Sequence, residues 1–247
     1  MTEFLPVVGV VGAGIMGTQI AQVIATAGCQ VRLFDANPAQ LPGAMDTIEN
    51  GRFGLRRAVD RGKISPDDLR ATLARIRPAV TLAEAVGEAG LTVEAVPEDL
   101  DLKCRVFRQM DELAPPRAIL TSNSAGLPIT ALAHATRRPS QVVGWHWAQP
   151  CAVMRMAEIV RAPSTSDETI AIVSDLARRC AKNPVVVKDQ PEQWGYVANR
   201  INAAVRRESR RVVDEGICTE EDVDQLMKDC FRWPMGPFEL WGGRTLK

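Results

Sequence analysis

The sequence predicts an α/β fold, in which a doubly wound, mainly parallel sheet carries a helical hairpin arm and a small all-helical C-terminal domain follows. Three observations lead to this prediction. Short apolar runs rich in β-branched residues alternate with helical stretches as far as residue 188, as in a parallel sheet. A long helical insertion, residues 38–84, interrupts the alternation early. From Tyr196 onward no strand signal remains. We therefore expect two domains, residues 1–188 and 189–247.

Composition excludes several classes of protein. Of 247 residues, 46% are hydrophobic and 24% are charged, with 30 basic and 30 acidic side chains, so nothing points to nucleic acid or a membrane surface as a partner. No apolar run reaches eighteen residues, and residues 1–6 lack an export signal. The six cysteines are dispersed without a C-x-x-C, so we expect free thiols, a cytoplasmic protein and no metal site.

The first 35 residues form one continuous pattern. Val7–Val11 is too short for a helix and rich in β-branched residues, so we expect a buried strand. Helical apolar spacing over Thr18–Ala27 stops at Gly28, and a second strand, Val31–Phe34, ends on Asp35. Between the first strand and the helix lies a complete G-x-G-x-x-G, made of Gly12, Ala13, Gly14, Ile15, Met16 and Gly17.

Each part of this pattern has a physical role in binding a dinucleotide. Gly12 permits a tight turn, Gly14 lets the backbone approach a pyrophosphate, and Gly17 lets helix and strand pack closely. The helix directs its free N–H groups toward the phosphates. Asp35, 18 residues beyond Gly17, can accept hydrogen bonds from both ribose hydroxyls and would repel a 2′-phosphate. The pattern favours a Rossmann-like domain that binds NAD, and the alternative is a glycine-rich turn in another α/β protein.

The insertion has helical signals and a basic face. We expect a helix over Met45–Asp60, a break at Gly62–Ile64, and a second helix that Ser65 caps, with Pro66 at its first position. Together they predict a helical hairpin arm. Its basic residues are Arg52, Arg56, Arg57, Arg61 and Lys63. These side chains either meet the phosphates of a large anionic substrate or form a solvated helix face, and charge alone does not decide between the two.

Polar residues follow later strands at the edge where open α/β sheets bind ligands. Glu98 comes after a strand at Leu91–Val96, and a polar loop, residues 122–126, follows the next strand. A further strand, Val142–Trp145, runs into His146. We therefore expect these polar groups to gather at one edge of the sheet.

His146 and Glu158, twelve residues apart, are the candidate catalytic pair. A carboxylate bonded to one ring nitrogen fixes the tautomer and stabilises the imidazolium, so that the other nitrogen can take a proton from a substrate alcohol. NAD chemistry needs such a base, because hydride leaves an alcohol carbon readily only as the hydroxyl proton is withdrawn. The alternative is a core histidine satisfied by the backbone, and spacing alone leaves both open.

Several separated motifs resemble those of the 3-hydroxyacyl-CoA dehydrogenases, over nearly the whole chain from Val7 to Leu240. The matching stretches are, in order, VGAGIMG, VEAVPEDLDLK, SNSAGLPIT, GWHWAQPCAVMRMAEIV, GYVANRI and WPMGPFEL. The resemblance implies reversible, NAD-dependent oxidation of a 3-hydroxyacyl-CoA, or a close 3-hydroxy analogue, to the 3-oxo form. It further implies a place in fatty acid metabolism and a homodimer.

The resemblance also implies roles for individual residues. His146 is then the general base, Glu158 its orienting carboxylate and Asn199 a group that positions the substrate. Cofactor contacts are implied for the glycine loop and for Asp35, Glu98, Lys103, Asn123 and Gln149. Substrate contacts are implied for Ser124 and Ala125, and for Arg57 and Arg61 on the arm, which looks like the arm that meets coenzyme A.

Three features depart from the family pattern. Ala125 stands where the family has a serine that touches the substrate, which removes a hydroxyl partner worth about 1–3 kcal/mol. Gln149 replaces an asparagine, and Trp145 and Trp147 bring bulk beside the histidine; together these suggest an altered substrate. The chain also stops soon after WPMGPFEL, so its C-terminal part must pack on the first domain or on another subunit, or else it is shortened.

Two other functions stay open. One is a dehydrogenase of a free 3-hydroxy acid or another small 3-hydroxy compound, in which the basic arm is merely solvated. The other is a catalytically weak NAD-binding or structural protein, which Ala125 and the short C-terminal part motivate. Turnover of a 3-oxo substrate, with and without coenzyme A, separates the three.

Overall fold

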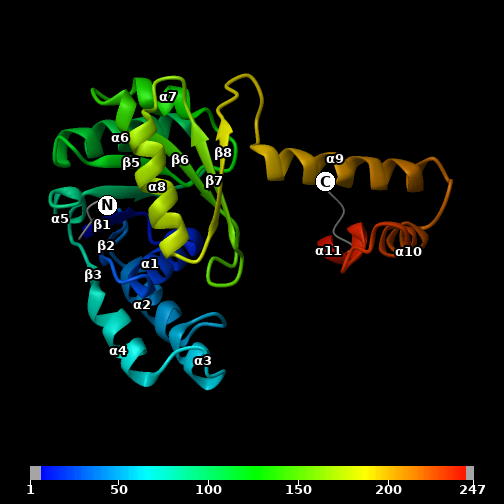
Figure 1. Ribbon diagram of the computed structural model, residues 1–247, viewed down its shortest axis with the longest axis horizontal. Coiled ribbons are helices and arrows are strands. Elements are labelled where there is room, and N and C mark those ends of the chain that lie inside the picture. The colour runs from blue at the N-terminus through cyan, green and yellow to red at the C-terminus, as the bar shows by residue number, and fades with distance from the viewer. Residues whose placement is uncertain (1–6, 243–247) are drawn as a thin grey trace. The chain divides into compact units, whose positions relative to one another are not determined.

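The computed structural model describes residues 7–242, and Figure 1 shows a twisted sheet in the first part of the chain. Eight strands lie in the order β3-β2-β1-β4-β5-β6-β7-β8. Neighbouring strands are parallel, except that β6 and β7 are antiparallel. The strands are β1 (Val7–Val11), β2 (Gln30–Phe34), β3 (Ile76–Pro78), β4 (Leu91–Glu94), β5 (Ile119–Ser122), β6 (Val142–Trp147), β7 (Met156–Arg161) and β8 (Asn183–Lys188).

Helices cover both faces of this sheet. Val8 and Val10 of β1 belong to a core cluster with the helices of one face, whereas Val11 belongs to a cluster with the helices of the other. Because β1 is buried on both sides, its sequence is a continuous apolar run rather than an alternating one. The first face carries α1 (Ile15–Thr26) and α8 (Asp167–Arg179), and the second carries α5 (Leu82–Val86), α6 (Leu100–Leu113) and α7 (Ile129–His134). The predicted doubly wound, mainly parallel sheet is confirmed.

The arm consists of three helices rather than two. They are α2 (Gln40–Asn50), α3 (Leu55–Asp60) and α4 (Pro66–Arg75). The prediction of one helix over Met45–Asp60 is therefore wrong. An added Cβ on Gly54 would lie 2.8 Å from the backbone nitrogen of Gly51, so this tight turn, which ends α2 early, requires glycine. The predicted cap of α4 is present, since Ser65 Oγ accepts the Asp68 N–H at 3.1 Å and Asp68 accepts the Ser65 N–H at 2.9 Å.

Some short elements gave no clear pattern in the sequence. Helix α4 ends at Arg75, because β3 begins at Ile76 and pairs with β2. A short 3-10 helix, Pro139–Gln141, precedes β6. The strand that carries Glu158, β7, was also not predicted, since its run of MAEIVR has a charge in the middle. That charge is tolerated inside the sheet because it has a partner on β6 (see below).

Contacts divide the chain into two compact units, one ending at Tyr196 and the other starting at Val197. The sequence placed the boundary after residue 188. The intervening segment belongs to the first unit because two of its side chains bond there. Asp189 accepts hydrogen bonds from the backbone N–H and the hydroxyl of Thr130, at 2.7 and 2.6 Å. Tyr196 is buried, and its hydroxyl donates to the Leu127 carbonyl oxygen at 2.6 Å.

The second unit is all-helical over its described residues, as predicted. It contains α9 (Val197–Asp214), α10 (Glu220–Phe231) and α11 (Pro237–Trp241). Thr219 caps α10 with a capping box, and Asp224 accepts the N–H groups of Phe238 and Glu239 at 2.7 and 2.9 Å. Arg210 of α9 lies over the Phe238 ring, 4.8 Å from its centre. These contacts join the three helices into one small core. Within residues 7–242 no helix is long and apolar enough to cross a bilayer.

The cysteines differ in burial, which gives a first testable prediction. Burial raises the pKa of both Cys151 and Cys180 to about 12, so these thiols stay protonated at pH 8, whereas Cys230 is exposed. Since the thiolate is the reactive form, iodoacetamide is expected to modify Cys230 in the native protein and to leave Cys151 and Cys180 unmodified until urea unfolds it. Peptide mass spectrometry after timed alkylation checks this. Modification of Cys151 at the rate of Cys230 in the native state would contradict it.

Candidate active site

The glycine loop has the three properties that the sequence predicted for it. Gly12 adopts φ +106°, a conformation that other residues rarely take. An added Cβ on Gly17 would lie 1.7 Å from the Gly12 carbonyl oxygen, so close packing there requires glycine. An added Cβ on Gly14 meets nothing within 4 Å. Gly14 therefore presents bare backbone to open space at the N-terminus of α1, where a pyrophosphate fits.

A cavity of about 1060 Å³ adjoins this loop, at the upper end of the range for ligand pockets. Asp35 stands in its wall at the end of β2, with Oδ2 accepting the Ala13 N–H at 2.7 Å and Oδ1 accepting the Asn37 N–H at 2.8 Å. Ala13 is thus held as part of the loop. Of the residues expected to bind the cofactor, the cavity is lined by Gly12, Gly14, Ile15, Met16 and Asp35. The loop could therefore cradle phosphates, and the fixed carboxylate of Asp35 could accept the hydroxyls of a ribose.

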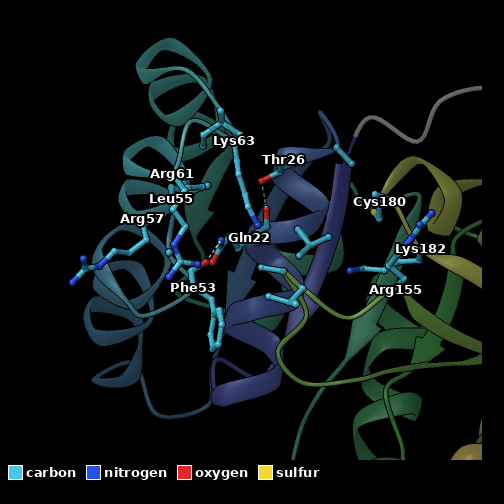
Figure 2. A pocket seen from close by; sticks show the side chains of 18 of the residues that line it. Gln22, Thr26, Phe53, Leu55, Arg57, Arg61, Lys63, Arg155, Cys180 and Lys182 are labelled. Carbon is cyan, nitrogen blue, oxygen red and sulfur yellow. Dashed lines mark hydrogen bonds between the residues drawn. The ribbon is translucent and has the colours of Figure 1, made fainter. Parts of the chain in front are cut away.

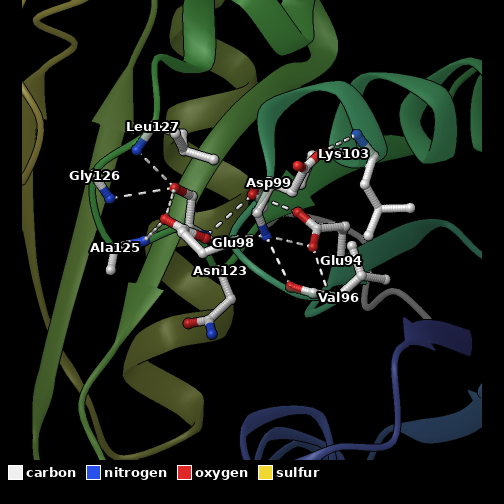
Figure 3. A network of polar contacts seen from close by, with 12 residues as sticks. Glu94, Val96, Glu98, Asp99, Lys103, Asn123, Ala125, Gly126 and Leu127 are labelled. Carbon is white, nitrogen blue, oxygen red and sulfur yellow. Dashed lines mark hydrogen bonds and ion pairs between the residues drawn. The ribbon is translucent and has the colours of Figure 1, made fainter.

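Other residues expected at the cofactor lie along the neighbouring strand ends. Glu98 Oε1 accepts the hydroxyl of Ser124 at 2.6 Å and the N–H of Ala125 at 2.8 Å. Figure 3 shows Glu98 directed toward Ala125. Asn123 Oδ1 accepts the N–H of Trp147 at 3.0 Å. Glu98 and Asn123 thus tie the loop after β5 to the segment after β4 and to the end of β6.

The structure places Lys103 and Gln149 differently from each other. Lys103 is only 1% exposed, and its ammonium group pairs with Glu94 at 2.7 Å, so it lies under the surface and not in the cavity wall. Gln149 is exposed in the turn between β6 and β7, where its peptide bond to Pro150 is cis. Their predicted contacts with the cofactor stay predictions.

Burial raises the pKa of Glu94, and the Lys103 ammonium opposes this shift.

His146 and Glu158 are in direct contact. They stand opposite each other in the antiparallel pair of β6 and β7, so both side chains project from the same face of the sheet. His146 Nδ1 lies 2.7 Å from Glu158 Oε2, and both residues are buried. The carboxylate therefore favours the tautomer with its proton on Nδ1, which leaves Nε2 as an acceptor. The spacing of twelve residues arises because β6 ends at Trp147 and the chain returns through residues 148–155 to begin β7 at Met156.

Tyr196 is a residue near this pair that the sequence did not single out. Its ring meets the His146 ring edge-on, with the centres 5.7 Å apart. Burial raises the pKa of Tyr196 above its ordinary value, so the phenol stays protonated and keeps its hydrogen bond to Leu127. The sequence shows only that Tyr196 comes directly before the C-terminal helices. That position does not reveal its contact with His146, 50 residues earlier in the chain.

The expectation that Trp145 and Trp147 add bulk beside the histidine is wrong. Side chains alternate along a strand, so both indoles project from the face opposite His146. They are buried in the core at 0% and 2% exposure, with their ring centres 4.6 Å apart. The two tryptophans support β6 from behind and do not shape the space around His146.

A second cavity, of about 350 Å³, lies between the arm and the far end of α8. Figure 2 shows Arg57 and Arg61 on its arm side and Arg155 and Lys182 on the opposite side. Gln22 of α1 helps to hold the arm, since its amide donates to the Phe53 carbonyl oxygen at 2.9 Å. The cationic lining residues are Arg52, Arg57, Arg61, Lys63, Arg155, Arg179 and Lys182. A cavity with so many cations suits an anionic ligand.

The cations of α8 and of the turn before β7 were not predicted. Lys182 is 6% exposed and donates to the carbonyl oxygens of Cys151 and, at 2.7 Å, Met154. Burial lowers its pKa. Arg57 and Arg61, which were predicted, have no ion-pair partner within the described part of the chain. Asn199, expected to position the substrate, lies on α9 in the second unit.

Known families match both units. Residues 7–190 match the family model described as "3-hydroxyacyl-CoA dehydrogenase, NAD binding domain", and residues 195–242 match the C-terminal domain of the same family. The chain belongs to the 3-hydroxyacyl-CoA dehydrogenase family. Its members are NAD-dependent oxidoreductases, which agrees with the glycine loop and Asp35 and confirms the predicted cofactor.

Individual members of the 3-hydroxyacyl-CoA dehydrogenase family are similar over almost the whole chain. A probable 3-hydroxybutyryl-CoA dehydrogenase of Bacillus subtilis is 37% identical over 94% of this chain and 78% of its own length. The crystal structure of (S)-3-hydroxybutyryl-CoA dehydrogenase from Ralstonia eutropha has a TM-score of 0.90 and 33% identity, covering 96% of this chain and 81% of that one. A diketoreductase that acts on dicarbonyl compounds has a TM-score of 0.87 and 30% identity, covering 97% and 83%.

Proposed function

We propose that this chain oxidises 3-hydroxyacyl-CoA thioesters reversibly to the 3-oxo form, with His146 as general base and Glu158 as its orienting carboxylate. The observation that supports this most is the 2.7 Å contact between His146 Nδ1 and Glu158 Oε2 on adjacent strands. Burying the carboxylate of Glu158 costs several kcal/mol unless it is paired. A histidine that only filled the core could bond to the backbone instead, so this pairing favours a catalytic role.

The proton moves through this pair. Nε2 of His146 accepts the proton of the substrate's 3-hydroxyl, and Glu158 stabilises the imidazolium that forms. The glycine loop and Asp35 would hold NAD, which would supply the acceptor for the hydride on the third carbon of the substrate. In the reverse direction the imidazolium returns its proton to the carbonyl oxygen. The loop of residues 123–127 lies beside this pair, since Asn123 accepts the N–H of Trp147. The substrate-positioning role expected of Asn199, on α9 of the second unit, stays a prediction.

The basic cavity supports coenzyme A as the carrier. Coenzyme A carries phosphate groups at the end far from its thioester, and the planar guanidinium of arginine binds phosphate through two parallel hydrogen bonds. Arg57 and Arg61 stand on the arm side of the cavity without carboxylate partners among residues 7–242. Arg155 and Lys182 face them across it.

The test compares acetoacetyl-CoA with free acetoacetate. Replacing Arg57 and Arg61 together by glutamine is expected to raise KM for acetoacetyl-CoA about ten- to a hundredfold, because charge-assisted hydrogen bonds are lost. KM for acetoacetate should stay unchanged, and absorbance of NADH follows both reactions. Arg70→Gln is the matched control, since Arg70 is exposed on the same arm but outside the cavity. An unchanged KM for acetoacetyl-CoA would count against the cavity as the site for coenzyme A.

A second candidate function is reduction of a small 3-oxo compound without coenzyme A. The likeness to the diketoreductase favours it, and so does Ala125, whose methyl side chain cannot offer a substrate the hydroxyl of a serine. In that case acetoacetate or a related diketone turns over faster than acetoacetyl-CoA, and the arm variants have no effect on either. Binding of NADH without any turnover would instead indicate a weak or structural NAD-binding protein.

Two further properties belong to this proposal. We propose a homodimer, because the second unit leaves large apolar side chains such as Leu226 and Phe231 exposed, at 61% and 62%. We also propose a cytoplasmic location, in keeping with six cysteines that form no disulfide. Sedimentation equilibrium over a hundredfold range of concentration tests the dimer.

A further inference from the structure

A buried ion pair lies beneath the loop of residues 123–127. Glu94, the last residue of β4, is 0% exposed, and Lys103 of α6 is 1% exposed. Lys103 Nζ lies 2.7 Å from Glu94 Oε1, as Figure 3 shows. No role in binding or catalysis has been given to Glu94 above.

Every polar atom of this pair has a partner. The ammonium group of Lys103 donates to Glu94 and, at 3.1 Å, to the Val96 carbonyl oxygen, and it lies 3.3 Å from Glu98 Oε2. Glu94 accepts the Val96 N–H at 2.7 Å on Oε1 and the Ser122 hydroxyl at 2.6 Å on Oε2. All polar atoms of the Glu94 and Lys103 side chains are therefore hydrogen-bonded or ion-paired, and neither charge is buried without a partner.

Two routes lead from the pair to the same loop. Through Ser122, whose hydroxyl oxygen accepts the Ser124 N–H at 3.1 Å, Glu94 holds the start of the loop. Through Glu98, which accepts both the Ser124 hydroxyl and the Ala125 N–H, Lys103 holds its middle. The loop in turn bonds β6 at Trp147, the residue next to His146.

Stability alone does not account for such a pair. Taking two charges out of water costs about as much as their attraction returns, so apolar side chains of the same volume would serve the core equally well. A fixed geometry is what an ion pair with fully satisfied hydrogen bonds supplies. The residues that it fixes here are those of the loop beside the candidate catalytic pair.

We propose that Glu94 is a positioning residue. With Lys103 it holds Glu98 and the loop of residues 123–127 in one arrangement, so that Asn123 and Ser124 stay in register with His146. The catalytic part of this inference rests on the proposed function, whereas the structural part, the immobility of the loop, does not.

The experiment uses Glu94→Gln, which keeps the shape and removes the charge. The matched control is Asp111→Asn, because Asp111 lies on the same helix as Lys103, is buried and pairs with Arg138 at 2.6 Å, away from the loop. Hydrogen exchange of peptides that span residues 122–127 reports the loop directly. Steady-state kinetics with acetoacetyl-CoA and NADH give kcat and the two KM values, and Tm gives the stability of each variant.

Glu94→Gln is expected to speed exchange in the loop at least about tenfold and to lower kcat about ten- to a hundredfold, with KM for NADH changed less than about threefold. Both variants lose a buried charge and should lower Tm by similar amounts. Asp111→Asn should nevertheless leave loop exchange and kcat at the wild-type values. Loop exchange equal to wild type in Glu94→Gln, or faster exchange with an unchanged kcat, would overturn the inference.

Two further arms keep the test decisive. Should Glu94→Gln fail to fold, Ser122→Ala removes one of the two routes and is expected to speed exchange at the start of the loop, and its failure to do so would overturn the inference equally. Should the wild-type protein not turn over acetoacetyl-CoA, the proposed function fails by that result. The exchange data then still decide whether the ion pair holds the loop.

Discussion

Replacement of His146 by glutamine is expected to lower kcat for acetoacetyl-CoA reduction by about 10²- to 10⁴-fold, the range for losing a positioned general acid or base. Glutamine keeps a polar side chain next to Glu158, so the fold is retained. The Kd for NADH should stay within about threefold, because the glycine loop and Asp35 follow other strands, β1 and β2. Stopped-flow absorbance gives the rate, and NADH fluorescence gives the affinity.

The chain offers a natural control for this substitution. It has only two histidines, and His134 is exposed at the end of α7. His134→Gln is expected to match the wild-type protein in both rate and affinity. A His146→Gln protein with more than a tenth of the wild-type kcat would remove His146 as the base.

Replacement of Gly14 by alanine is expected to abolish cofactor binding without harming the fold. The added Cβ meets no atom within 4 Å, and the backbone there, at φ −69° and ψ −169°, suits alanine. The methyl group would instead occupy the space through which a pyrophosphate approaches the loop, so the Kd for NADH should rise at least about a hundredfold. Fluorescence titration with NADH measures it, and Tm in the absence of cofactor should not change.

Gly43→Ala is the control for this second variant. An added Cβ at Gly43 also meets nothing within 4 Å, but Gly43 lies within α2 on the arm. Alanine favours a helix over glycine, so a gain of about 0.4–1 kcal/mol in the free energy of unfolding is expected, with unchanged affinity for NADH. If Gly14→Ala bound NADH as well as Gly43→Ala does, the loop would not be the pyrophosphate site.

The features that the sequence predicted are those that local physics determines. Gly12, Gly14 and Gly17 lie where a larger side chain would strain the backbone or fill the space beside it, so the residue type itself is informative. Asp35 was predictable because it comes directly after the short apolar strand β2. The cap at Ser65 is equally local. Short, largely apolar strands that alternate with helices favour a parallel sheet. For these reasons the sheet, the cofactor and the edge that carries the site were all predictable.

What was missed depends on contacts between distant residues. Strand β6 continues past Trp145 to Trp147 because it pairs there with β7, a strand that the sequence did not reveal, and alternation then puts both indoles on the face opposite His146. The network of Glu94 and Lys103 joins a strand end to a helix, and Lys182 meets Cys151 across 31 residues. The break in the arm between α2 and α3 depends on close backbone packing at Gly54. None of these contacts leaves a periodic signal in the sequence.

The proposed proton transfer requires that the Nε2 atom of His146 is an acceptor because Glu158 holds the proton on Nδ1. Nitrogen-15 NMR of the histidine rings measures this, since two histidines give few signals and His134→Gln assigns them. At a pH where the ring is neutral, His146 is expected to carry its proton on Nδ1, and this signal should change in Glu158→Gln. A neutral His146 with its proton on Nε2 in the wild-type protein would contradict it.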